Sequence, residues 1–137
     1  MRPDEFEEQM ELSARKLGYR FNRIGENVWV LRRRTSLPFS IHFTQIDEDS
    51  SLVSIFANVM KVPKEDEEKL YRFLLEVNYH GLLHGCFALH GDEVVLKKTF
   101  PARDLMMAEL FAVVASLEKA WDLHAPGLAR YGKIRKF

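Results

Sequence analysis

The amino-acid sequence predicts an α+β domain in which helices pack on an antiparallel β-sheet. Three segments place apolar residues at helical spacing, and others are short β-prone runs or alternate apolar and polar residues as strands do. The links between neighbouring strands are of hairpin length, and such links join antiparallel strands. The predicted order of elements is therefore α-β-β-β-α-β-β-α, with the helices packed on one sheet.

Helices are predicted in three places. The first covers residues 6–17 and is closed by Gly18, a residue suited to the C-terminal cap. The third runs from Asp104, a suitable N-cap, to about His124, where a Pro-Gly pair follows. It is apolar on nearly every side, which indicates cover by more than one neighbour. The second covers residues 64–80 and carries one apolar stripe, formed by Leu70, Phe73, Leu74 and Val77.

Strand patterns cover residues 19–24, 28–32, 39–44, 52–62, 83–89 and 93–100. In the third run apolar and polar residues alternate, so His42 is expected on the polar face. In the fourth run both faces are largely apolar, because Ile55 lies on one face and Phe56 on the other. We therefore expect something to cover each side of this strand.

Composition indicates one globular domain. The chain has 137 residues, 47% of them hydrophobic, with 20 basic and 20 acidic residues and no net charge. We assign residues 1–127 to a single α+β domain and residues 128–137 to a basic C-terminal tail. One cysteine cannot form an internal disulfide, and no apolar run is long enough to cross a bilayer. We therefore expect a cytoplasmic protein that does not interact with membranes.

A cluster of histidines surrounds the single cysteine. His84, Cys86 and His90 share one face of the predicted strand, but the outer two lie roughly 20 Å apart along it. Zinc ligands must lie within about 2.3 Å of the ion, so these three cannot hold one metal. We expect no metal, no cofactor and no catalytic residue. An enzyme that uses Cys86 with His84 stays open as a rival hypothesis.

The segment 70-LYRFLLEVNYHGLLHGCFALHGDEVVLKKTFP-101 carries a family likeness. It combines a helix that ends near an Asn, a Gly-x-aromatic-x-Leu strand, a Gly-Asp turn, an apolar strand and a Phe-Pro step into a long helix. In this pattern and in its order of elements the chain resembles the YbjN-like proteins. These are related in fold to the type III secretion chaperones of the CesT kind.

The resemblance implies a small, non-enzymatic α+β domain that forms homodimers. It also implies that the partner is a segment of another protein, held by apolar grooves and exposed strand edges. The residues that we predict to bind this partner are Trp29, Phe39, Ile41, Phe43 and Phe56. Those that we predict to form the dimer interface are Leu70, Phe73, Leu74, Val77 and Phe87.

Two further alternatives remain besides the enzyme hypothesis. The helices can cover these apolar faces within the monomer, which would make the predicted residues plain core. The protein can also be a regulatory module that binds nucleic acid through Arg32–Arg34 and the basic tail. Zero net charge and the lack of a nucleic-acid motif argue against nucleic acid as the main partner.

Overall fold

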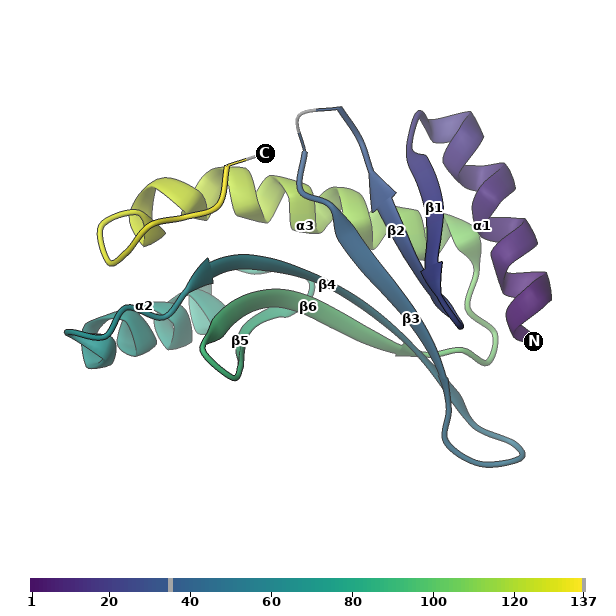
Figure 1. Ribbon diagram of the computed structural model, residues 1–137, viewed down its shortest axis with the longest axis horizontal. Helices are drawn as coiled ribbons and strands as arrows, with labels where there is room; N and C mark the ends of the chain where they lie inside the picture. The colour runs from purple at the N-terminus through teal and green to yellow at the C-terminus, as the bar shows by residue number, and fades with distance from the viewer. Residues whose placement is uncertain (35, 137) are drawn as a thin grey trace.

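The computed structural model describes residues 1–34 and 36–136, and it contains one six-stranded sheet and three helices (Figure 1). The elements are α1 (Pro3–Leu17), β1 (Arg20–Gly25), β2 (Val28–Arg32), β3 (Phe39–Gln45), β4 (Ser51–Lys61), α2 (Glu67–His80), β5 (Cys86–His90), β6 (Glu93–Pro101) and α3 (Met107–Leu128). The predicted α+β class and order of elements are confirmed. The structure has four strands before α2, whereas the predicted order counts three.

The strands lie in the order β1-β2-β3-β4-β6-β5, and every neighbouring pair is antiparallel. Strands β1 to β4 follow one another across the sheet through short links. The chain then passes through α2 to β5 at the far edge and returns as β6 between β5 and β4. Strands β1 and β5 are therefore the two edges of the sheet.

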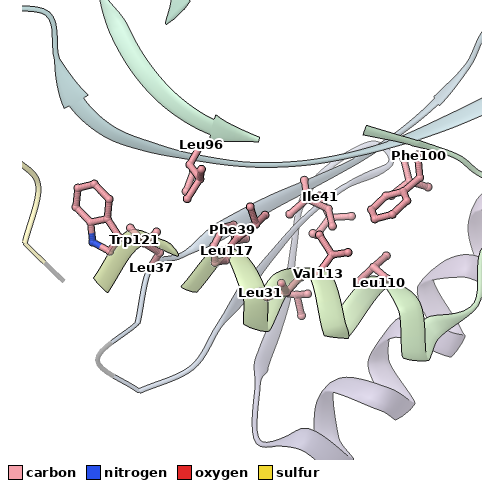
Figure 2. Close-up of a cluster of buried hydrophobic side chains, with 14 of the residues drawn as sticks. Leu31, Leu37, Phe39, Ile41, Leu96, Phe100, Leu110, Val113, Leu117 and Trp121 are labelled. Carbon is pink, nitrogen blue, oxygen red and sulfur yellow. The ribbon is translucent and has the colours of Figure 1, made fainter. Parts of the chain in front are cut away.

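All three helices pack on one face of this sheet. Figure 2 shows Leu110, Val113, Leu117 and Trp121 of α3 directed toward sheet residues such as Leu31, Ile41 and Leu96. Buried side chains of α1 and α2 belong to the same cluster, among them Phe6, Met10, Leu70 and Leu74. Because α3 also has α1 along one end and α2 beside the other, its many apolar residues find cover on several sides, as the sequence predicted.

The helix boundaries differ from the prediction at four points, of which the first is that α1 begins at Pro3 and not at residue 6. Helix α2 begins three residues later than predicted because Asp66 adopts the left-handed conformation, with φ of 58°. Helix α3 begins at Met107 because Asp104 is also left-handed, with φ of 60°. It then continues through Pro126 to Leu128. Proline is tolerated there because only one carbonyl in the exposed last turns loses its partner.

Strand β4 changes its pattern near its end. Its buried residues alternate as Val53, Ile55, Ala57 and Val59, but Met60 is buried as well. The register between β4 and β6 shifts between Asn58 and Met60, as a β-bulge does, so Met60 rejoins the helix-covered face. Leu52 and Phe56 lie on the opposite face and are only half-buried. Within the described residues the helices therefore cover only one face of this strand, and cover of the other face by a partner or a second subunit stays a prediction.

Strand β5 is shorter than predicted and starts at Cys86. Gly85 precedes it with φ of 73°, and a Cβ at this position would lie 2.5 Å from the carbonyl oxygen of Lys97. Only glycine fits both the conformation and the close approach to β6.

None of the helices in residues 1–34 and 36–136 has the length and apolar character that crossing a bilayer requires.

The indole of Trp29 gives a first testable prediction. Trp29 packs against Phe6 with ring centroids 5.5 Å apart, yet its buried Nε1 has no hydrogen-bond partner among the described residues. Replacing Trp29 by Ala should cost about 3–5 kcal/mol because it opens a large cavity. Replacing it by Phe should cost no more than about 1.5 kcal/mol, because an unsatisfied N–H, which costs about 1–3 kcal/mol, is removed as well. Urea unfolding measures both, and equal losses would contradict this account.

Candidate functional site

Four of the five predicted partner-binding residues lie in the hydrophobic core. Trp29, Phe39, Ile41 and Phe43 are each 4% exposed or less and face the helices. Their burial gives these four side chains a packing role and leaves nothing for a partner to contact in this conformation. Phe56 is different, because it is half-buried on the opposite face of the sheet.

The predicted dimer residues also point inward. Leu70, Leu74 and Val77 are buried beneath α2, and Phe87 of β5 is buried on the helix-covered face. Phe73 is partly buried and packs against Tyr131, with ring centroids 5.3 Å apart. This stripe therefore holds α2 onto its own subunit.

The face of the sheet opposite the helices is an accessible surface in the described part of the chain. Register places one row of residues directly opposite one another across five strands, namely Val30, Ser40, Phe56, Lys97 and Cys86. Each of them is half-buried, whereas most of their neighbours along the strands, such as Ile41, Ile55 and Leu96, are buried beneath the helices. We call this surface the open face.

A groove of about 380 Å³ crosses the open face over β3, β4, β6 and β5. We call it the sheet groove. It has apolar walls from Phe56, Ala88, Leu89 and Val95, together with hydrogen-bonding groups from Ser54 and Lys97. Such a mixture of apolar walls and a few polar groups is typical of binding sites.

His42 lies in the sheet groove beside Phe56, with ring centroids 4.8 Å apart. Partial burial lowers the pKa of its imidazole below the ordinary value of 6.5, because burial disfavours the charged form. The ring is therefore neutral near pH 7 and serves as an aromatic wall with a polar edge. The expectation that His42 points to the polar face agrees with this placement.

The two edges of the sheet differ in accessibility. At β5 the side chain of Asn78 closes the edge: its Nδ2 donates to the carbonyl oxygen of Phe87 at 2.9 Å, and its Oδ1 accepts from the Phe87 amide at 2.7 Å. Within residues 1–34 and 36–136, strand β1 pairs with β2 alone, and its residues are mostly exposed. Backbone groups at an uncapped edge strand can pair with an added strand, so β1 is the edge at which a partner strand can be added.

Helix α2 exposes a second apolar surface on its outer side. Tyr71, Leu75 and Tyr79 follow one another at four-residue spacing and line a shallow hollow. Leu75 is 68% exposed and Tyr79 is 84% exposed. We call these three residues the α2 stripe.

The predicted basic patch is partly neutralised. The guanidinium of Arg33 forms an ion pair with the buried carboxylate of Glu118, with 2.6 Å between nitrogen and oxygen, and lies over the ring of Tyr19. The hydroxyl of Tyr19 donates to the same carboxylate at 2.7 Å. Arg32 and Arg34 are exposed.

The basic tail packs on the domain instead of extending freely. Ile134 forms a β-bridge with Met60, and the Arg135 amide donates to the carbonyl oxygen of Val59 at 2.9 Å. The Arg135 side chain forms an ion pair with Glu93 at 2.8 Å. Residue 137, the last of the predicted tail, lies outside the described residues, and the predicted boundary at 127 falls in the last turn of α3.

The histidines around Cys86 do not form a metal-binding cluster in the part of the chain that the structure describes. Within residues 1–34 and 36–136, no three His, Cys, Asp or Glu side chains are close enough to hold one ion. Cys86 is half-buried on the open face, with Lys97 opposite it on β6.

Sequence reasoning missed the α2 stripe and the polar members of the sheet groove. It treated conspicuous apolar residues as surface candidates, although those residues complete the core. A signal for the missed residues was present. In a sheet that helices cover on one face only, the residues that alternate with the core positions, such as Ser54, must face outward. In α2, the apolar residues outside the buried stripe must do the same.

Comparisons with known proteins agree with this architecture. The sequence model of the CesT_Tir_1 family matches residues 17–134. Among solved structures, YbjN from E. coli, described as a candidate transcription regulator, has a TM-score of 0.55 over 85% of each chain at 14% identity. At this identity the likeness concerns the fold alone. The predicted resemblance to YbjN-like and CesT-like proteins is confirmed, and no curated protein matches the chain.

The contacts of Tyr19 predict a dependence of stability on pH. Burial and the hydrogen bond to Glu118 raise the pKa of Tyr19 well above its ordinary 10.0. Above pH 10 the unfolded chain loses this proton while the folded protein keeps it, so the free energy of unfolding should fall as pH rises.

Replacing Tyr19 by Phe removes both the hydrogen bond and the titrating group. Below pH 9 the variant should be less stable than the wild type by about 1 kcal/mol, and this gap should narrow above pH 10. Urea unfolding of the wild type and the variant across this range measures the gap. A gap that stays constant from pH 8 to 11 would show that Tyr19 titrates alike in both states.

Proposed function

The chain belongs to the CesT_Tir_1 family, and on that premise we propose that it is a non-enzymatic, chaperone-like protein that binds an extended segment of a partner protein. The observation that carries this proposal is the open face, which the three helices leave accessible while they pack together on the other side. We further propose that the protein acts as a homodimer and in the cytoplasm.

The open face offers the two kinds of contact that an extended segment needs. The sheet groove provides apolar walls for alternate side chains, and the uncapped edge of β1 provides backbone donors and acceptors. Proteins that bind extended segments commonly combine such side-chain pockets with strand addition. Asn78 blocks the same mode of binding at β5, so we assign strand addition to β1.

The α2 stripe fits a second copy of the chain. A two-fold axis through the middle of the stripe would place Leu75 against its own copy and Tyr71 against Tyr79 of the other subunit. Such a self-complementary patch is what a two-fold dimer requires. Aromatic residues beside a leucine are also typical of interface centres. This interface replaces the inward-facing residues predicted from the sequence.

A nucleic-acid-binding regulator is the second candidate function. YbjN, whose fold is similar, is described as a candidate transcription regulator, and Arg32 and Arg34 are exposed. Ion pairs occupy Arg33 and Arg135, which removes two of the charges that this function would use. If it holds, affinity for DNA should fall steeply between 50 and 200 mM salt, on the order of a hundredfold or more.

The proposed dimer is tested by changing Leu75 to Glu. A carboxylate at the centre of an apolar interface should shift the dimer to a monomer, because the charge loses its hydration without gaining a partner. Light scattering measures the mass over a range of concentrations. Leu123→Glu is the matched control, since Leu123 is 70% exposed on α3 and lies outside the stripe. A dimer that persists in Leu75→Glu would contradict this interface.

The binding face is tested by changing Ser54 to Arg in the middle of the sheet groove. The probe is reduced, carboxymethylated α-lactalbumin, a protein that stays unfolded. The wild type should bind it, and the variant should bind it at least about tenfold more weakly because the new side chain fills the groove. Ala112→Arg, an exposed change on α3, should bind as the wild type does. Equal binding by both variants would place the binding surface elsewhere.

A further inference from the structure

We propose that the sheet groove recognises a segment that carries an acidic residue two positions away from an apolar one, with the carboxylate bound at Lys97. This inference rests on the proposed function and names the class of segment that the groove accepts. Three observations support it, namely the distribution of charge over the strands, the surroundings of Lys97 and the spacing of the groove residues.

Charge is segregated in this chain although its total is zero. The six strands contain a single acidic residue, Glu93, and their basic residues are Arg20, Arg23, Arg32, Lys61, Lys97 and Lys98. Arg135 neutralises Glu93 at 2.8 Å, and Glu7 of α1 lies 3.8 Å from Arg23 on the helix-covered side. The strand register then places Arg20, Arg32, Lys61 and Lys97 on the open face.

Lys97 lies in the wall of the sheet groove. It is half-buried between Phe56 of β4 and Cys86 of β5, the residues directly opposite it. Among residues 1–34 and 36–136, no carboxylate forms an ion pair with its ammonium group. Because Lys97 lines the groove, its ammonium group can form a charge-assisted hydrogen bond with a carboxylate that enters the groove. A bound acidic side chain would supply that carboxylate.

The spacing of the groove residues matches an extended partner. Lys97 and Val95 point to the same side of β6 two residues apart, which in a strand is about 7 Å. A bound segment in extended form presents its own residues i and i+2 at the same interval. With a carboxylate at Lys97, the next side chain on that face lies over the apolar wall formed by Val95 and Ala88.

This chemistry favours a peptide over a nucleic acid. Four basic side chains are spread across the open face, and Arg32 lies three strands away from Lys97, or roughly 14 Å measured across the strands. The groove beside Lys97 combines apolar walls from Phe56, Leu89 and Val95 with polar side chains such as Ser54. A phosphate backbone needs closely spaced cations along its length, whereas one carboxylate beside an apolar residue needs only one cation.

The test uses three fluorescein-labelled peptides with the sequence TVTETFTVT and its two versions that carry Gln or Lys in place of Glu. Fluorescence anisotropy measures their affinities for the wild type, Lys97→Gln and Lys98→Gln. Lys98 is the matched control, because it neighbours Lys97 on the same strand but points to the other side, 5.5 Å from the ring of Phe100. A nine-nucleotide oligothymidine serves as the nucleic-acid probe.

We expect the Glu peptide to bind the wild type about tenfold more tightly than the Lys peptide, with the Gln peptide between them. Lys97→Gln should abolish this preference and Lys98→Gln should keep it. Equal binding of the three peptides, or equal effects of the two variants, would overturn the acidic preference while leaving the proposed function in place. No binding of any peptide would overturn both. Tighter binding of the oligonucleotide than of the Glu peptide would overturn the inference in favour of nucleic acid.

Discussion

Helix α3 buries Leu110, Leu117 and Trp121 against one face of the sheet, and the other elements are arranged around this packed layer. Helices α1 and α2 complete the cover on the same side, where their apolar stripes join one continuous core. Burial of apolar side chains is the main force that holds such a layer together. Since all three helices are used on one side, the opposite side of the sheet keeps a half-buried, partly apolar surface.

Strand β4 shows how one stretch of chain supplies both surfaces. Ile55 is fully buried beneath the helices, whereas Ser54 and Phe56 line the sheet groove on the other side. The same alternation separates Lys97, which lies in the groove, from Lys98, which does not. Because helices pack behind the strands that carry the sheet groove, the groove is held in a fixed shape, and this preorganisation favours the proposed binding on the open face.

Much of the fold could be predicted from the sequence, because Gly18 and the buried stripe of α2 follow local rules for helices. The N-cap predicted at Asp104 failed because a left-handed turn competes with the cap there. The site was harder to predict, because the alternating sequence pattern around Ile41 and Phe43 is the same whether these residues face the helices or the solvent. Their burial depends on which face the helices occupy, and that is a property of the tertiary structure. Leu75 could have been placed on the outer side of α2, because it lies outside the buried stripe, but a single exposed leucine does not by itself indicate an interface.

The central claim is that the face opposite the helices is the binding surface. Methyl-resolved NMR of the protein labelled at Ala, Leu and Val, titrated with the peptide TVTETFTVT, tests it most directly. The account predicts that the methyl signals of Ala88, Leu89 and Val95 shift while those of Val94 and Leu96, which point to the helices, stay unchanged. Shifts confined to the helix side or to Leu75 of α2 would contradict it, because they would place the ligand on a surface other than the open face.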